Sequence, residues 1–234
     1  MDSAVVFDLW GPLAVYRKFY TNTSILSYAF PPPTAVKGLV GAFLGMMRIQ
    51  YGRELRDMQV AVSLCHPVKK LYTTINYVST KEGNTLLNGG RTQIPTEIIK
   101  DPYYCIYLRN MPENRKEQLV ELLANHCSIF TPYLGTSEML ANFQFVGEYP
   151  IEDKVSDDPV FVNSIVPVEV IVPSLLTQYG NRLGKERIPL LMDEYKQTLY
   201  YIDVAFDMGA KPIPIKGSYS IVNGVNVRFL TVNL

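Results

Sequence analysis

The sequence is poor in the residues that usually carry covalent stapling, metal binding or acid–base chemistry. Its 234 residues include three cysteines, two histidines and one tryptophan. Cys65, Cys105 and Cys127 are far apart and never form a CxxC pair, which argues against a disulfide framework or a zinc site. A reducing cytoplasm is the simplest location for such a chain, and we predict no metal and no other cofactor.

Long apolar runs are missing as well. The longest, residues 38–47, is far shorter than the roughly 20 residues that a membrane span needs. The N-terminus also lacks a basic flank followed by an apolar stretch. We therefore expect no membrane span and no export signal. With 47% apolar and 19% charged residues, the composition is that of a globular protein with a substantial core.

The net charge is zero, but it is unevenly distributed. Residues 1–116 carry 14 Lys and Arg against 8 Asp and Glu, so the remainder has the opposite balance. A basic N-terminal half suits a polyanionic ligand, and an acidic remainder suits solvent or a basic protein partner. Chance is an equally good explanation of the charge balance taken alone.

The pattern of the first 150 residues predicts an α+β domain. Strands are expected at 4–10, 58–66, 103–109 and 142–149, with helices after the triple proline at 31–33 and after Pro112. We expect Thr34 to be the N-cap of the first helix. This order is the split βαβ plan of ferredoxin-like domains, the architecture that RNA-recognition (RRM-like) modules also use.

Two further regions complete the predicted organisation. Turn signals within a Tyr- and Thr-rich segment predict a protruding β-hairpin over about 68–100. The acidic run 152–159 ends at a proline, and we place the boundary of a smaller, mostly β C-terminal region there, at 151–234. Expected strands in that region cover 160–172, 198–206, 218–222 and 225–232.

The loop after the first strand combines cations with aromatic rings. Rings stack on unpaired bases at roughly 1–3 kcal/mol each, and cations neutralise the phosphates between them. This combination suits single-stranded nucleic acid. A surface loop with core-packed tyrosines and solvated cations would have the same sequence. The residues concerned are Gly11, Pro12, Tyr16, Arg17, Lys18 and Tyr20.

The helix start after the prolines is a second candidate. Thr34 and the first free amides form a partial positive pole that could hold a phosphate, with Lys37 one turn further on. Gly38, Gly41 and Gly45 leave one helix face nearly bare, so that another group can approach its backbone. Tight packing of that face on the sheet is the alternative.

These segments resemble a known family. Residues 7–18 (FDLWGPLAVYRK) and 28–38 (YAFPPPTAVKG), with Gly41 and Gly45, look like the signature of the fifth CRISPR-associated (Cas) family. The stretches 90–93 (GRTQ), 95–98 (PTEI) and 131–137 (TPYLGTS) agree with it. The resemblance covers the first 150 residues well, the rest loosely, and is closest to subtype I-B.

The resemblance implies a non-catalytic subunit of a type I Cascade surveillance complex that caps the 5′ handle of the CRISPR RNA in antiviral defence. It implies a ferredoxin-like domain whose hairpin forms a thumb that crosses the guide. Expected partners are the CRISPR RNA, the Cascade backbone and large subunits and, through the complex, target DNA. The loop at 11–20 and the helix start at 34–38 would grip the handle. Arg91, at the base of the hairpin, would contact phosphate, and the loop containing Tyr133 and Gly135 would complete the pocket.

Two other functions stay open at this point. One branch of the family, in subtype I-C, is similar in sequence but cuts the guide precursor without metal by a Tyr, Lys and His set, so a metal-independent endoribonuclease is the runner-up. Acid–base cleavage of RNA usually needs a histidine, and only His66 and His126 are present. We expect both to be structural. The third reading is a ferredoxin-like regulatory module that binds a small metabolite.

Overall fold

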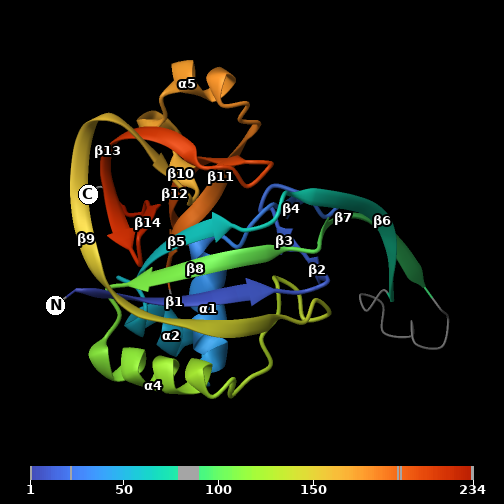
Figure 1. The fold of residues 1–234 in the computed structure, drawn as a ribbon. Helices are drawn as coiled ribbons and strands as arrows, with labels where there is room; N and C mark the ends of the chain where they lie inside the picture. Colours follow the sequence, from blue (N-terminus) through green and yellow to red (C-terminus); the bar gives the residue numbers. More distant parts are fainter. Residues whose placement is uncertain (1, 22, 79–89, 194, 196, 233–234) are drawn as a thin grey trace.

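The computed structural model describes residues 2–21, 23–78, 90–193, 195 and 197–232. The fold is mixed α+β and mostly β, with helices gathered beside a curled sheet (Figure 1). Among the described residues, no helix is long and apolar enough to span a membrane. The elements of the first 150 residues are β1 (Ser3–Trp10), β2 (Leu13–Ala14), β3 (Tyr16–Arg17), β4 (Ser27–Tyr28), α1 (Pro33–Phe43), α2 (Arg48–Glu54), β5 (Gln59–Leu64), β6 (Lys69–Val78), β7 (Arg91–Lys100), β8 (Tyr103–Arg109), α4 (Glu113–Ala124) and the first part of β9 (Asn142–Val162).

The central sheet is buried on both faces along β1. Its strand order is β14-β13-β9-β1-β8-β5, and the neighbours pair antiparallel. Phe7 and Leu9 belong to the main core beneath α1 and α4, whereas Ala4 and Val6 pack with C-terminal residues on the other face. Successive strand residues point to opposite faces, so two covered faces explain the nearly continuous apolar run of this strand.

The predicted elements of the first 150 residues are largely confirmed. Strands at β1, β5, β8 and the start of β9, and helices at α1 and α4, lie where the hydrophobic periodicity predicts them. The expected N-cap is wrong, because Pro32 is the N-cap of α1 and no side chain caps this helix. Pro33 begins the helix, where a proline loses no hydrogen bond, so Thr34 lies one residue inside it.

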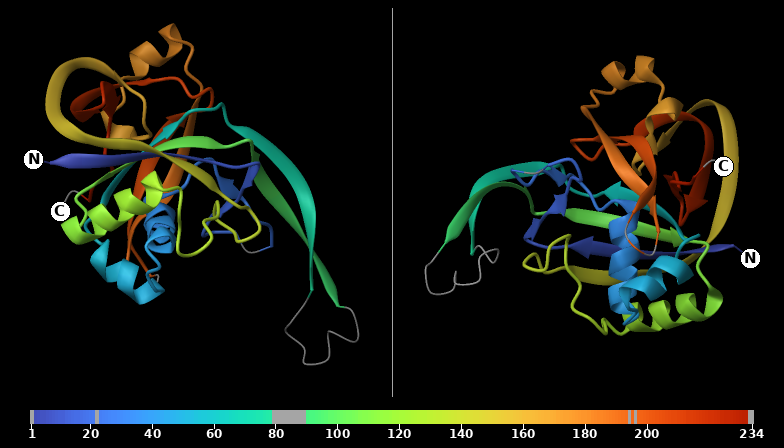
Figure 2. Two further views of the ribbon diagram at one scale, coloured as in Figure 1. Left: turned by 60° about the horizontal axis from the view of Figure 1, so that its bottom comes forward. Right: turned by 180° about the vertical axis from the view of Figure 1, so that it is seen from behind.

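The strands of the predicted hairpin are also observed. β6 and β7 pair antiparallel from Lys69 opposite Lys100 to Val78 opposite Arg91, and they extend away from the body of the molecule (Figures 1 and 2). Their outer residues are mostly exposed, and only 96–99 of β7 are buried. The predicted turn at 82–84 lies outside the described residues.

The acidic run 152–159 does not interrupt the backbone. It lies within β9, whose first half pairs with β1 and whose second half pairs with β13. The partner therefore changes near residue 150 while the strand continues, and the division into regions 1–150 and 151–234 stays a prediction. The remaining elements are β10 (Val166–Pro167), the 3-10 helix η1 (Val168–Val170), α5 (Pro173–Gln178), β11 (Leu183–Met192), β12 (Thr198–Asp207), β13 (Ile213–Val222) and β14 (Val225–Val227).

The C-terminal region is mostly β, as predicted, but it differs from the expected strands in three respects, one of which is that β14 ends at Val227 and not at residue 232. β11 and the short helix α5 have no counterpart among the expected strands, and residues 168–170 form η1 in place of a strand. β11 pairs with β12 in a three-stranded sheet that packs against the N-terminal end of α1. Ile188 and Phe206 join the main core, so the C-terminal strands help to enclose the α1 region.

Candidate functional site

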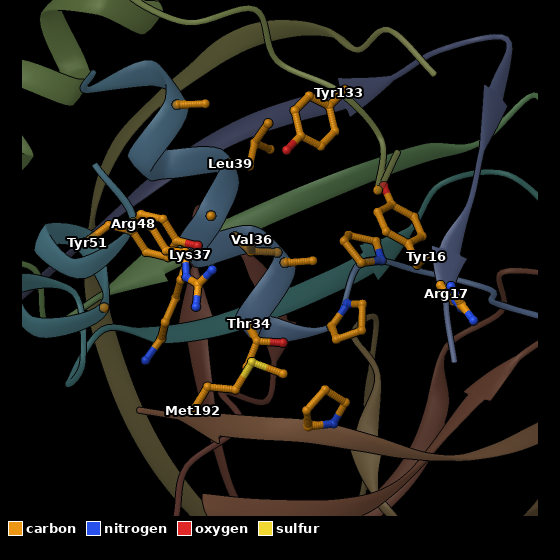
Figure 3. Close-up of a pocket in the computed structure, with 18 of the residues that line it drawn as sticks. Tyr16, Arg17, Thr34, Val36, Lys37, Leu39, Arg48, Tyr51, Tyr133 and Met192 are labelled. Atoms are coloured by element: carbon orange, nitrogen blue, oxygen red, sulfur yellow. The ribbon is translucent and has the colours of Figure 1, made fainter. Parts of the chain in front are cut away.

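A cavity of about 630 Å³ lies beside the N-terminal half of α1. Its walls come from the segment around β3, from α1 and α2, from the loop at 130–135 and from the end of β11 (Figure 3). Segments from four separate parts of the sequence thus converge on one hollow, whose volume is within the range of small-molecule and cofactor sites.

Seven of the twelve predicted site residues line this cavity. They come from the three segments that the sequence singles out, which are therefore brought together in space. The residues that line it are Tyr16, Arg17, Thr34, Lys37, Gly38, Tyr133 and Gly135. The other five, which do not line it, are Gly11, Pro12, Lys18, Tyr20 and Arg91.

The loop after β1 is held in place by short strands. β2 pairs with β7, β3 pairs with β4, and the Val15 amide donates to the Leu134 carbonyl over 3.0 Å. Tyr16 is consequently buried with 5% exposure, while the next residue, Arg17, is exposed. Arg17 Nη2 donates to the Thr21 carbonyl at 3.1 Å and stays accessible at the cavity rim.

Lys18 is not the exposed cation that the sequence suggests. Its side chain is buried, and its Nζ lies 2.6 Å from one carboxylate oxygen of Glu186 on β11 and 2.8 Å from the other. Burial by itself would lower the pKa of Lys18, but the hydrogen bond and charge of Glu186 raise it above its ordinary value. Lys18 thus neutralises a carboxylate of its own chain and is not available to a phosphate.

The start of α1 is a weaker anion site than predicted. The Ala35 and Val36 amides both donate to the Pro32 carbonyl, at 2.8 and 3.0 Å, and Pro33 has no N–H. Few free amides are therefore left to point at a ligand. Lys37 does line the cavity, where its Nζ donates to the Arg56 carbonyl, and burial lowers the pKa of Lys37 to about 8.

The bare face of α1 is covered by another helix of the same chain. A Cβ built on Gly41 would lie 2.8 Å from Tyr51 Cδ1, whereas one on Gly38 would lie 3.8 Å from the Tyr51 hydroxyl. Gly41 thus allows the Tyr51 ring of α2 to pack directly on the α1 backbone. The expected close approach to this face is observed, and its partners are Tyr51 of α2 at Gly41 and Ile129 at Gly45, not the sheet.

Two predicted glycines serve packing. Gly135 has a φ of +94°, and a Cβ there would lie 1.9 Å from the Val15 carbonyl oxygen. A Cβ on Gly11 would lie 2.7 Å from the Leu140 carbonyl oxygen. Both glycines let the loop at 130–141 close against the β1–β3 segment, and this contact places Tyr133 at the cavity.

Helix α2 supplies cavity residues that the sequence reasoning missed. Arg48, Tyr51 and Arg56 all line the cavity and come from this helix or its end. The only hint in the sequence is the cluster of arginines at 48–56, directly after the glycine-bearing helix. Arg48 Nη2 donates to the Tyr195 carbonyl at 3.2 Å.

The cavity carries an excess of positive charge. Its described lining residues include four cations, at positions 17, 37, 48 and 56, and one carboxylate, Asp193. That carboxylate already accepts hydrogen bonds from the Tyr195 and Gln197 amides, at 2.9 and 2.7 Å. The site therefore favours an anionic ligand.

Arg91 lies far from the cavity, at the outer end of the described hairpin. It pairs in register with Val78, whereas the base of the hairpin is the pair Lys69 and Lys100. The placement of Arg91 at the base is therefore wrong. The base is instead organised by the buried Glu97, which accepts hydrogen bonds from Lys70 Nζ at 3.0 Å and the Tyr72 hydroxyl at 2.7 Å.

Both histidines lie outside the cavity lining. His66 is exposed, packs beside the Tyr103 ring and has Nδ1 3.2 Å from the Asp101 carbonyl oxygen. His126 has a φ of +53° just after α4 and stacks on Phe143. Within the part of the chain that the structure describes, no group of three or more His, Cys, Asp or Glu side chains is arranged to hold a metal ion.

The fold is similar to that of solved CRISPR proteins. A CRISPR protein from Archaeoglobus fulgidus is 12% identical with a TM-score of 0.59, and the match covers 97% of this chain and 98% of that one. A chain of a CRISPR RNA-guided surveillance complex is also 12% identical with a TM-score of 0.57, covering 90% and 91%. At this identity the likeness concerns the fold.

Comparison at the sequence level gives the family. No curated protein matches this chain. The protein family described as CRISPR-associated protein (Cas_Cas5), however, matches over residues 4–190, which include the convergent segments at 16–17, 34–38 and 133–135. The resemblance of the N-terminal signature is thereby confirmed, and the chain belongs to the CRISPR-associated protein (Cas_Cas5) family.

Proposed function

We propose that this protein is a subunit of a CRISPR effector complex that holds the 5′ handle of the CRISPR RNA without cutting it. The observation that carries the proposal is the cavity, where signature segments of the family meet four cations and several aromatic rings. Cations that neutralise phosphates, together with rings that stack on bases, are the usual means of binding a single strand.

The proposed architecture is a ferredoxin-like domain with a thumb. The ferredoxin-like domain is supported by the part of the sheet ordered β9-β1-β8-β5, with α1 and α4 as connections. The thumb is supported by the extended and mostly exposed pair β6–β7 (Figure 2). Subtype I-B stays a prediction from the sequence resemblance.

The proposed partners follow from the family. A neighbour of similar fold is titled as part of a CRISPR RNA-guided surveillance complex, which supports assembly with other complex subunits. We propose the backbone and large subunits of Cascade as neighbours, target DNA as an indirect partner and the cytoplasm as the location.

A holding role is favoured over cleavage by the position of the histidines. His66 and His126 do not line the cavity, so neither is placed to transfer a proton to RNA bound there. Lys18, which the sequence assigns to the grip, is left out of it because Glu186 neutralises it. The proposed grip is Arg17, Lys37, Arg48 and Arg56.

RNA binding by the full chain tests the proposal. The chain is incubated without metal with labelled RNA of the repeat that flanks the spacers, and binding is measured over a range of salt concentrations. Arg17→Ala, Arg48→Ala and Arg56→Ala should each weaken binding. Each should also flatten the logarithmic salt slope by about 0.7, the value for one phosphate contact on a single strand.

The control is Lys154→Ala, which removes an exposed cation of β9 remote from the cavity. It should leave affinity and slope unchanged. Discrete cleavage of the RNA, lost in His66→Ala or His126→Ala, would favour the endoribonuclease. If the three arginine variants behave like the control, the assignment of the cavity to RNA is wrong.

A further inference from the structure

The second face of the central sheet, opposite α1, is covered at one end only. Val6 of β1 belongs to a buried cluster there with Val222 and Phe229. This cover ends before Asp8, and both Asp8 and Trp10 are only half-buried. Figures 1 and 2 show α1 on the far side of the sheet from this face. We call its uncovered end the open face. Two rows of register partners form it: Asp8 with Cys105 and Gln144, and Trp10 with Tyr103 and Asn142.

Aromatic rings stand on the open face beside a carboxylate. The rings of Trp10 and Tyr103 stack with centroids 5.5 Å apart and an interplanar angle of 12°. The His66 ring lies 5.1 Å from that of Tyr103. The Tyr103 hydroxyl donates to Asp8 Oδ2 at 2.8 Å. Burial and the neighbouring Asp8 raise the pKa of Tyr103 to about 12, so this phenol stays a neutral donor.

Asp8 lacks a cation of its own chain. Among the described residues no ion pair includes Asp8, and the nearby Lys69 is paired with Asp101 at 3.7 Å. Cys105, opposite Asp8 in the register, is a neutral thiol, because burial raises its pKa to about 12. A half-buried carboxylate without a matching charge costs free energy, which a cation from another molecule would offset.

The open face suits a guanidinium group better than a nucleic acid. Guanidinium is planar, stacks on aromatic rings and donates paired hydrogen bonds to a carboxylate. The exposed Gln144, in register with Asp8, adds an amide oxygen that accepts further N–H groups. A phosphate would be repelled by Asp8, and none of the six residues of the open face is a lysine or arginine.

Going beyond the proposed RNA-holding role, we infer that the open face is the docking site for an arginine side chain of a neighbouring protein subunit. The guanidinium lies against the rings of Trp10 and Tyr103 and pairs with Asp8. The inference rests on the proposed function only in that the chain works within a complex. Leu9, which belongs to the core on the opposite face, lines the cavity beside α1, so the two sites lie on different sides of the sheet. Protein and RNA can therefore be bound together.

Competition for a place in the complex tests the role of Asp8. The unaltered chain and Asp8→Asn, with different affinity tags, are co-expressed with the other subunits of the effector complex. Their ratio in the purified complex is measured by mass spectrometry. The unaltered chain should be enriched about tenfold, the worth of one hydrogen bond to a charged group. Equal shares would overturn the inference. Glu152→Gln, which neutralises an exposed carboxylate of β9, is the control and should compete equally.

A photo-cross-link identifies the occupant without altering Asp8. p-Benzoylphenylalanine replaces the exposed Gln144, and the peptide attached after irradiation of the complex is sequenced by mass spectrometry. We expect a segment of another subunit that carries an arginine. Changing that arginine to glutamate should restore the assembly of an Asp8→Arg chain. Cross-links to RNA, to a segment without arginine or to no partner would overturn the inference.

Failure of this inference and failure of the proposed function are distinguishable. Asp8 does not line the cavity, so Asp8→Asn alone should bind the repeat RNA as the unaltered chain does. Equal incorporation of Asp8→Asn with intact RNA binding overturns the docking site and leaves the proposed function in place. A chain that binds no RNA but still cross-links to an arginine-bearing segment overturns the proposed function alone.

Discussion

Lys18 and Glu186 form an ion pair of 2.6 Å across 168 residues of sequence, with both side chains about nine-tenths buried. The pair ties the loop after β1 to β11. It therefore links the segment that carries Tyr16 and Arg17 to the C-terminal strands that enclose the same cavity.

We predict that Lys18→Met destabilises the protein by about 3 kcal/mol, because it leaves the Glu186 carboxylate buried without its partner. The free energy of unfolding is measured by urea denaturation. Lys185→Ala is the control, since Lys185, next to Glu186 on β11, forms an exposed pair with Asp203 on β12, and exposed pairs contribute about 1 kcal/mol or less. Equal midpoints for the two variants would contradict the importance of the buried pair.

Gly41→Ala should lower the melting temperature although alanine favours helices. The new methyl group would lie 2.8 Å from the Tyr51 ring and 3.1 Å from Tyr51 Cβ, so α2 has to shift and the cavity changes shape. Gly38→Ala is the control, because its methyl group meets only an ordinary contact at 3.8 Å and gains about 0.8–1 kcal/mol of helix propensity. If both variants melt at the same temperature, α2 does not depend on the absence of a side chain at position 41.

Lys37 should make stability depend on pH in alkaline solution. Its pKa is lowered from 10.5 to about 8 in the folded chain, so between these values the unfolded chain binds more protons. The contribution of Lys37 to the free energy of unfolding therefore increases as the pH rises from about 8 to 10.5. Lys37→Met should remove this contribution, so the difference in unfolding free energy between the two proteins changes between pH 8 and pH 10. A pH-independent difference would contradict the shifted pKa.

RNA affinity should change in the opposite direction over the same window. Loss of the Lys37 charge above pH 8 removes one cation from the cavity, so binding should weaken as the pH rises. The measurement is the dissociation constant of the repeat RNA at pH 7 and pH 9. In Lys37→Met the dissociation constant should be larger at pH 7 than that of the unaltered chain. It should also change less between pH 7 and pH 9.

Glu97 should stabilise the base of the hairpin in a pH-dependent way. Burial alone would raise its pKa, but hydrogen bonds from Tyr72 and Lys70 outweigh burial and lower it. Because the pKa of Glu97 is depressed in the folded chain, its carboxylate stabilises the protein above pH 4.5. This stabilisation is lost as the pH falls through the pKa of the folded chain. Glu97→Gln should therefore unfold more easily at pH 7, and its deficit should shrink in acid. A deficit that stays constant down to pH 3 would mean that the carboxylate charge is not involved.

Hydrophobic patterns were enough to predict the elements that are well buried. β1 is recognisable as a short apolar run that stops at Gly11 and Pro12, and α1 because its apolar residues recur at the spacing of a helix. β11 was missed because its fully buried residues are confined to 188–190, directly after three charged residues at 185–187, and because the strand contains a proline. α2 was missed because none of its residues is fully buried, so it shows no clear apolar stripe.

The candidate site could be predicted in its segments but not in its individual contacts. The signature segments do meet, yet Lys18 turns inward because of a carboxylate far away in sequence that no local pattern indicates. The position of Pro33 as the first residue of α1 was available from the sequence, since proline favours that position, and it excludes the N-cap assigned to Thr34. Arg91 was misplaced although the sequence was sufficient, because in a hairpin over 68–100 the base is at residues 68 and 100, and residue 91 lies near the turn, as the register confirms.

The unbroken course of β9 has a consequence for any attempt to divide the protein. Cleavage near residue 150 would sever one strand that hydrogen-bonds to β1 before that point and to β13 after it. Two fragments produced there would not behave as modules joined by a tether. They could regain the native arrangement only by strand complementation, which makes this position a stringent site for a split-protein assay of assembly.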